Sequence, residues 1–266
     1  MKILPLSISI VIYRLIILGI LSAMSCQALA ISSLQQKDKS LPFQSRYYEI
    51  VKDAEDGFPE AQFLLGMMYR IGYIVEEDLE KASYWLHTSA MLGYAEAQSA
   101  VGSLYEFGDT VVQDTKIAAY WFQLAALQEH GPAEDKLGHM YANGVGVMRD
   151  FREALKWFER AMTHGYLQGQ QNLAWLLATA PEDELRDGGR ALLLIEPILK
   201  ENEHNPGVLD TLAAIYAEIG RFEEAAKVQE KALGLLINSP VNDEDRAVKF
   251  TKRLEFYQKG VPWRWD

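Results

Sequence analysis

The chain has 266 residues, of which 49% are hydrophobic and 24% are charged, and its 26 basic and 37 acidic side chains give a formal net charge of −11. This acidic balance disfavours binding to nucleic acid or to anionic lipid, and it favours solubility or a basic partner. Cys26 is the single cysteine, so a chain from which residues 1–30 are removed can have neither a disulfide framework nor a cysteine-ligated metal site.

Residues 1–30 are predicted to form a secretory signal peptide. Lys2 and Arg14 are their only charges, an apolar run covers 15–24, and a small-x-small sequence ends at Ala30. These features are typical of a cleaved export signal. Cleavage after Ala30 would leave 24 basic and 37 acidic residues, a charge of −13, and we expect no membrane span in the mature chain.

Two other fates of this segment stay open. An uncleaved anchor would place Arg14 near the bilayer centre, at a cost of a few kcal/mol. Lipidation at Cys26 is the second alternative, although the residues before it lack the pattern usual for lipoproteins.

A short polar leader, 31–43, is expected to precede an N-terminal capping helix at 44–57. Its Tyr48, Ala54 and Gly57 come 36 residues before Tyr84, Ala90 and Gly93 of the second helix of the first repeat. A capping element is needed because the first repeat would otherwise expose its apolar face.

Residues 58–166 contain one unit three times, at an interval of 36 residues. A glycine, a tyrosine and a tryptophan recur in every copy: Gly66, Gly102 and Gly138; Tyr69, Tyr105 and Tyr141; Trp85, Trp121 and Trp157. Such a period, with helical spacing inside it, predicts an all-α fold, a right-handed α-solenoid of antiparallel helix pairs.

The repeated positions have distinct structural roles. The three glycines fall inside the first helix, where glycine costs roughly 1 kcal/mol against alanine, so we expect the neighbouring helix to approach closely there. A second set of glycines is predicted to cap the first helix and a set of aspartates the second. These are Gly72, Gly108 and Gly144, and Asp78, Asp114 and Asp150.

The tryptophans lie on the second helix between small residues, as in Ala82, Trp85 and Ser89. We expect them to fill the space between the two helices. Loss of a buried tryptophan costs about 3–5 kcal/mol, so Trp121 in the middle copy is the predicted most damaging truncation.

The sequence AEAQSAVGSLYEFG, followed by VVQD and AAYWFQLAA, resembles the Sel-one-like repeat family, relatives of tetratricopeptide repeats. The resemblance covers 58–166. It departs in the loops, where the second glycine of the family pattern is present only as Gly146, while Ile74 and Thr110 replace it in the first two copies. The resemblance implies an adaptor that binds other proteins, as in signalling, envelope assembly or host interaction.

After residue 166 the period changes. Residues 167–236 are expected to form tetratricopeptide-like helix pairs, with Pro197 bending or ending one helix. The stretches NLAWLLATAPEDELRDGGRAL, DTLAAIYAEIGRFEEA and LEFYQKGVPW resemble a C-terminal module of bacterial repeat proteins. Residues 237–266 are expected to supply a C-terminal capping helix, near 242–259, and a tail at 262–265 that packs back on it.

The search for catalytic motifs finds none. HExxH, GxSxG, a P-loop and a dinucleotide fingerprint are all missing from the sequence, so we predict no catalytic residue, no cofactor and no metal. Asp135 and His139, four residues apart, could in principle hold a metal or relay a proton, but a solvated or weakly paired surface couple is favoured. Carboxylate pairs for glycoside hydrolysis cannot be recognised in one dimension and stay open.

The remaining candidate is a surface. The first helix of each pair in such a solenoid lines the concave side, where eight residues not needed for packing are predicted to contact a partner. They are Phe63, Met67, Arg70, Ser99, Ser103, Glu106, Asp135 and His139. Phe63 and Met67 would form an adaptable apolar spot, with Arg70 beside it to bind a carboxylate. The alternative for Phe63 is packing inside its own repeat.

We therefore expect a non-enzymatic scaffold, periplasmic or secreted, whose concave face binds a protein or peptide in the cell envelope. Two alternatives stay open. One is an envelope protein that binds or hydrolyses peptidoglycan or another carbohydrate. The other is a membrane-anchored assembly factor that keeps its N-terminal segment.

Overall fold

The chain forms a curved row of helix pairs in the computed structural model, which describes residues 43–239 and 243–265. The predicted signal peptide 1–30, with Cys26, and residues 31–42 of the predicted leader lie outside the described residues. Within the described part, the secondary structure is helical throughout, with no strand. The all-α prediction is confirmed.

The N-terminal helix α3 (Phe43–Glu55) stands where the capping helix is predicted. The three repeats supply the pairs α4 (Pro59–Ile71) and α5 (Leu79–Met91), α6 (Ala95–Phe107) and α7 (Thr115–Ala126), and α8 (Gly131–Asn143) and α9 (Phe151–Thr163). The rest consists of α10 (Leu167–Thr179), the short turn η1 (Asp183–Leu185), α11 (Gly188–Glu201), α12 (Pro206–Glu218), α13 (Phe222–Ile237) and α14 (Glu244–Gln258).

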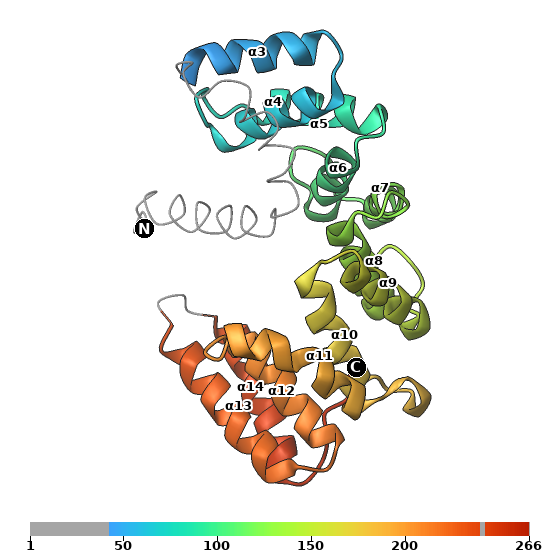
Figure 1. The fold of residues 1–266 in the computed structure, drawn as a ribbon, viewed down its shortest axis with the longest axis vertical. Helices are drawn as coiled ribbons and strands as arrows, with labels where there is room; N and C mark the ends of the chain where they lie inside the picture. Colours follow the sequence, from blue (N-terminus) through green and yellow to red (C-terminus); the bar gives the residue numbers. More distant parts are fainter. Residues whose placement is uncertain (1–42, 240–242, 266) are drawn as a thin grey trace.

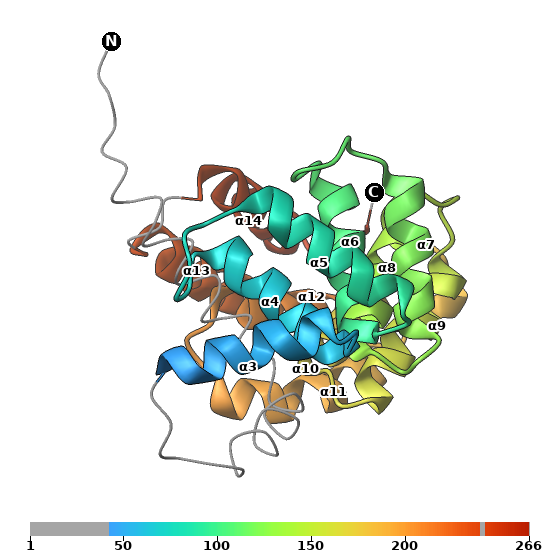
Figure 2. The ribbon, with the colours of Figure 1, turned by 90° about the horizontal axis from the view of Figure 1, so that it is seen from above.

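The helices follow one another along an arc (Figure 1). α6, α8 and α10 lie along its inner side, whereas α7 and α9 lie along its outer side. The view from above shows that the row also curls, so that α13 and α14 come round beneath the α4–α5 end (Figure 2). Each helix packs against the helices next to it in sequence, which is the arrangement of a solenoid.

The predicted helix ends are present in all three repeats. Gly72, Gly108 and Gly144 adopt φ values of 63°, 71° and 67°, and their N–H groups donate to carbonyls of the preceding turn. The side chains of Asp78, Asp114 and Asp150 accept hydrogen bonds from the first N–H groups of α5, α7 and α9. Each repeat therefore caps its own helices.

The glycines inside the first helices make the close approach that their spacing predicts. A Cβ atom on Gly102 would lie 2.9 Å from the ring of Phe122, and one on Gly138 would lie 2.4 Å from the ring of Phe158. Gly66 faces Leu86 in the same way. The second helix can therefore approach the first only because this position carries no side chain.

The same contacts correct the prediction made for the tryptophans. The space between the two helices is filled by the residue after each tryptophan, namely Leu86, Phe122 and Phe158, and all three are fully buried. The tryptophans are only partly buried, and each packs against a core cluster formed by the first helix of its own pair and the helices before it, as Trp121 does with α4, α5 and α6. The buried stripe of the second helix is thus i, i+4, i+7 rather than i, i+3, i+7.

The loops have one shape despite their different residues. Ile74 and Thr110 adopt φ values of 71° and 70°, close to the 73° of Gly146. Such values are unfavourable for β-branched residues. In the third copy only glycine fits, because a Cβ on Gly146 would lie 2.1 Å from the carbonyl oxygen of Thr115.

The C-terminal helices are joined by buried polar groups. Arg253 of α14 donates two hydrogen bonds of 2.8 Å to the two carboxylate oxygens of Asp210 on α12, and Gln229 of α13 donates to the same carboxylate at 2.8 Å. The expectation that Pro197 could end its helix is wrong, since α11 continues to Glu201. Gln170 of α10 donates to the carbonyl of Leu194 at 2.7 Å, which satisfies a carbonyl beside the disturbed turn.

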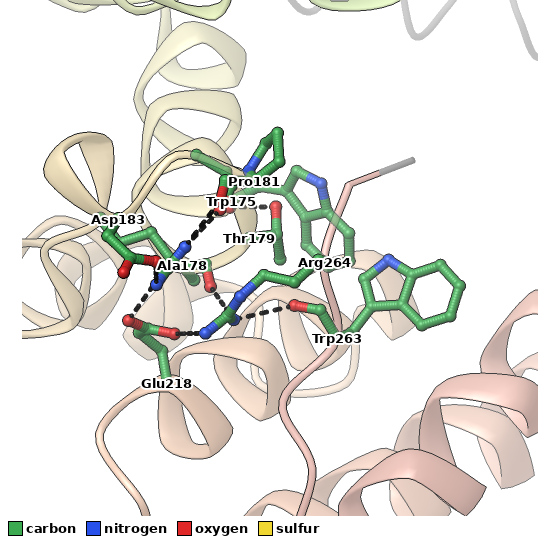
Figure 3. Close-up of polar contacts among 10 residues, drawn as sticks. Trp175, Ala178, Thr179, Pro181, Asp183, Glu218, Trp263 and Arg264 are labelled. Carbon is green, nitrogen blue, oxygen red and sulfur yellow. Dashed lines mark hydrogen bonds and ion pairs between the residues drawn. The ribbon is translucent and has the colours of Figure 1, made fainter.

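The C-terminal tail packs against α14, and it also contacts α10 and α12. Trp263 stands edge-on to Phe256 at 5.2 Å between ring centroids, whereas the N–H of Trp265 donates to the carbonyl of Thr179 at 2.7 Å. Arg264 forms an ion pair of 2.8 Å with Glu218, and its guanidinium also points to the carbonyl of Ala178 (Figure 3). The tail therefore ties the C-terminal helices to the end of α10.

Candidate partner-binding surface

The inner side of the arc is built from the first helices of the repeats and from α10, which continues their row. Of the eight predicted contact residues, two are buried. Phe63 is 7% exposed and packs edge-on against Tyr94 at 5.5 Å, and Asp135 is 6% exposed. These two stabilise the interior, so the accessible candidates are Met67, Arg70, Ser99, Ser103, Glu106 and His139.

Two charged candidates are already paired with neighbouring repeats. Arg70 donates to Asp109 at 2.8 Å, and Glu106 accepts from Lys136 at 2.8 Å. Arg70 thus has a carboxylate of its own chain, and the carboxylate of a partner would have to replace Asp109 or share the guanidinium with it. These pairs bridge successive repeats, and they leave little unpaired charge at these positions.

Asp135 and His139 meet a third residue that sequence spacing did not indicate. Asn172 of α10 donates to Oδ1 of Asp135 at 2.7 Å, and the same amide lies 2.9 Å from Nε2 of His139. The imidazole is 3.9 Å from the carboxylate and stands edge-on to Phe158. The two side chains are therefore weakly paired, as the favoured prediction allows, but they do not form a solvated couple, because Asp135 is buried and an amide lies between them.

The surroundings of Asp135 and His139 shift the pKa values of both side chains. Burial raises the pKa of Asp135 to about 6, although the hydrogen bond from Asn172 opposes this shift. Burial, with a smaller effect of Lys136, lowers the pKa of His139 to about 4. At neutral pH the imidazole is uncharged, and it can offer a hydrogen bond to a bound polar group.

One row of partly exposed side chains lies on the helices that line the inner side. Met67, Ser103, His139 and Trp175 occupy equivalent positions on α4, α6, α8 and α10, each 36 residues after the last. Trp175 and Asn172 could not be predicted from the three repeats, because both lie beyond residue 166, where the third repeat ends. Extension of the 36-residue step from His139 finds the tryptophan.

Two classes of site find no support among the described residues. Over 43–239 and 243–265, no group of three or more His, Cys, Asp or Glu side chains is arranged to hold a metal ion. None of the helices in those ranges combines the length and apolar composition needed to cross a membrane.

Comparison with known proteins connects this geometry to a repeat family. The Sel1 repeat family model matches residues 59–94, 95–130 and 131–166. Among curated proteins, none matches the sequence significantly.

The chain is similar to several solved structures. The antigen c5321, described as a protective antigen of uropathogenic Escherichia coli with an SLR fold, is 22% identical with a TM-score of 0.57. The alignment covers 79% of this chain and 48% of that protein, so the chain spans about half of its length. A Sel1 repeat protein from Oxalobacter formigenes is 30% identical with a TM-score of 0.46, over 47% of this chain and 95% of that one. Cysteine-rich protein B of Helicobacter pylori is 20% identical with a TM-score of 0.40, over 48% and 95%.

Proposed function

Residues 59–166 are three Sel1 repeats, and from this premise we propose that the chain is an exported, non-enzymatic adaptor whose concave face binds a peptide or protein in the cell envelope. Sel1 repeat proteins typically mediate protein–protein interaction, and the fold is generally a scaffold without catalytic activity. The concave face, the export and the envelope role are the parts that we propose.

The observation that carries the proposal is the row of Met67, Ser103, His139 and Trp175. Methionine and tryptophan at its ends can pack against apolar side chains, and methionine adapts to different shapes. Serine and a neutral histidine between them can exchange hydrogen bonds with a peptide backbone. An uncharged row of this kind suits an extended segment laid along the inner side.

The charge of the chain acts at longer range. Arg70 and Glu106 are paired within the chain, so the inner side itself does not select a charged ligand strongly. The net charge of −13 that remains after removal of residues 1–30 would instead accelerate the approach of a basic partner, and this effect weakens as salt is added.

The binding proposal is tested by crosslinking in cells. Photoreactive residues at Met67, Ser103 and His139 should capture the same partner, whereas one at Lys200, exposed on α11, should not. Substitution His139→Glu should weaken capture at the other two positions, because it places a charge in the middle of the row. Capture that is equal at all four positions would contradict a concave site.

Two further measurements separate the alternatives. Mass spectrometry of the protein isolated from cells should show a chain that begins at Ile31, and an intact N-terminus would favour the membrane-anchored alternative. Purified protein should neither release muropeptides nor bind protein-free sacculi, and either activity would favour the carbohydrate alternative.

A further inference from the structure

The positions four residues before the row of partly exposed side chains form a second set along the same helices. They are Phe63, Ser99, Asp135 and Gln171 on α4, α6, α8 and α10, each 36 residues after the last. Gln171 is partly exposed on α10, which lies on the inner side of the arc (Figure 1). Its amide donates to the hydroxyl of Thr211 on α12 at 3.3 Å. The inner side therefore continues from α10 to the N-terminal half of α12.

The side chain of Arg246 on α14 lies at this end of the inner side. A Cβ atom on Gly207 would lie 2.6 Å from Nη2 of Arg246 and 3.7 Å from Nε2 of Gln171. The guanidinium and the amide are therefore close together, at the first turn of α12. The guanidinium is also 5.3 Å from the ring centroid of Phe250, and this contact helps to hold it in place.

Unlike the charged residues of the repeats, Arg246 has no carboxylate partner among the described residues. Over 43–239 and 243–265 it forms no ion pair, whereas the nearby Arg253 is paired with Asp210. The charge of Asp210 also acts on Arg246, but its oxygens already accept hydrogen bonds from Arg253 and Gln229. The first turn of α12 contains no acidic residue, so nothing there compensates the guanidinium.

The acidic residues at the start of α14 do not neutralise this group either. Asp243 caps the helix, and its carboxylate accepts from the backbone N–H of Arg246 at 3.0 Å. Glu244 and Asp245 precede Arg246 by two residues and by one, and such neighbours do not face each other on a helix. The guanidinium is therefore free to bind an anionic group from outside the chain.

We propose that Arg246 binds the C-terminal carboxylate of the peptide segment that lies along the inner side, an inference that rests on the proposed concave binding. A guanidinium offers two parallel N–H groups, which match the two oxygens of a carboxylate. The amide of Gln171 uses one N–H on Thr211, and its second N–H can donate to the same carboxylate. Arg246 thus sets where the bound segment ends and in which direction it runs.

A chain end fits this position better than an acidic side chain does. With 24 basic and 37 acidic residues after removal of residues 1–30, the chain repels partners rich in acidic residues and attracts basic ones. A basic segment still carries one carboxylate when it includes the end of its chain. The inner row spans four helices about 10 Å apart, so a segment of roughly twelve residues, at about 3.3 Å each, covers the row and reaches α12.

The test is affinity selection on the immobilised purified protein, read by mass spectrometry. The probe is a pool of twelve-residue peptides of random sequence, made once with free C-terminal carboxylates and once as C-terminal amides. The native chain should retain the free pool at least fivefold better than the amide pool, and Arg246→Gln should remove this preference. The matched control is Arg149→Gln, which should keep it. Arg149 is also exposed and unpaired within the described ranges, and it lies 5.7 Å from the ring centroid of Phe151, outside both rows.

Three results of this selection would overturn the proposal. One is equal retention of the two pools by the native chain. Another is a preference for the free pool that survives Arg246→Gln. The third is retention that depends on Arg246 but follows aspartate or glutamate inside the peptides, which would assign the guanidinium to an acidic side chain instead.

Crosslinking in cells separates this inference from the proposed function. A photoreactive residue at Lys249, exposed three residues after Arg246, should capture the C-terminal peptide of the partner that is captured at Met67, Ser103 and His139. If these three positions capture a partner but Lys249 captures only an internal segment of it, the carboxylate site is wrong and concave binding stands. If none of the positions captures a partner, both proposals are wrong.

Discussion

The Sel1 repeats are stabilised by contacts between residues close in the sequence, whereas the C-terminal helices depend on contacts between distant residues. In the repeats, each glycine cap and aspartate cap lies within the unit that it ends, and Gly102 receives Phe122 from the next helix along the chain. In the C-terminal region the hydrogen bonds join residues far apart in the sequence. Arg253 donates to Asp210 across 43 residues, and Arg264 donates to the carbonyl of Ala178 across 86 residues. Local contacts repeat in the sequence, whereas distant ones do not.

The end of α10 shows the difference most directly. The position that is Gly108 and Gly144 in the repeats is Ala180 here, and it does not take the left-handed conformation of a glycine cap. The carbonyls at this end are instead satisfied by Arg186, which donates to Ala180, and by the N–H of Trp265, which donates to Thr179. Distant side chains and the tail therefore replace the local cap.

The largest expected effect comes from the core of the repeats. Phe122→Ala should lower the free energy of unfolding by about 4 kcal/mol, because it empties a fully buried site against Gly102. Trp121→Ala should cost clearly less, since its ring is partly exposed. Urea unfolding followed by circular dichroism measures both, and the reverse order would restore the tryptophan as the main core residue.

The next effect concerns the polar core of the C-terminal region. Arg253→Ala should cost about 3 kcal/mol, because it leaves the carboxylate of Asp210 buried without its partner. The matched control Asp210→Leu/Arg253→Met should recover most of this loss, because no charge is then buried. In Arg253→Ala, amide hydrogen exchange should become faster in α12 to α14 first. Equally faster exchange in all the helices would contradict the view that the C-terminal helices are stabilised separately from the repeats.

Removal of the tail should cost about 2 kcal/mol, from two lost hydrogen bonds to the end of α10 and lost aromatic contacts. A chain that stops at Pro262 should exchange amide hydrogens faster at residues 176–180 and 214–218. The caps of the repeats, for instance around Gly108, should be unaffected. Unchanged exchange at α10 would show that the tail does not close this end.

A pH effect of similar size is expected at Asp135. Its pKa is raised to about 6 from 3.8, so its stabilising contribution is complete below pH 3.8 and is lost as the pH rises through 6. Asp135→Asn should therefore match the native chain near pH 3.8 and exceed it by about 2 kcal/mol at pH 7.5. Urea unfolding of both chains at the two pH values measures this difference. The same difference in the free energy of unfolding at pH 3.8 and at pH 7.5 would contradict the prediction.

The smallest effect is expected in the loops. Ile74→Gly should raise the free energy of unfolding by about 1 kcal/mol, because a β-branched residue at a φ of 71° is strained. The reverse change at the third loop, Gly146→Ile, should be strongly destabilising because a Cβ would collide with the carbonyl of Thr115. Thermal melting compares the two, and a destabilised Ile74→Gly chain would mean that the side chain contributes more than the strain costs.

The sequence by itself determined the solenoid, the helix ends and the packing glycines, because these depend on contacts within 36 residues that recur three times. From the sequence, Trp121 was predicted to fill the space between the helices, whereas the buried residue is Phe122, the next in the chain. The two side chains are similarly apolar, and only the direction in which the helix face points distinguishes them. The sequence could not show that Phe63 is buried, that Arg70 is paired, or that Asn172 joins Asp135, because burial and pairing depend on the neighbouring repeat. The position of the tail was likewise decided only by the tertiary structure, where the uncapped end of α10 lies within reach of Trp265.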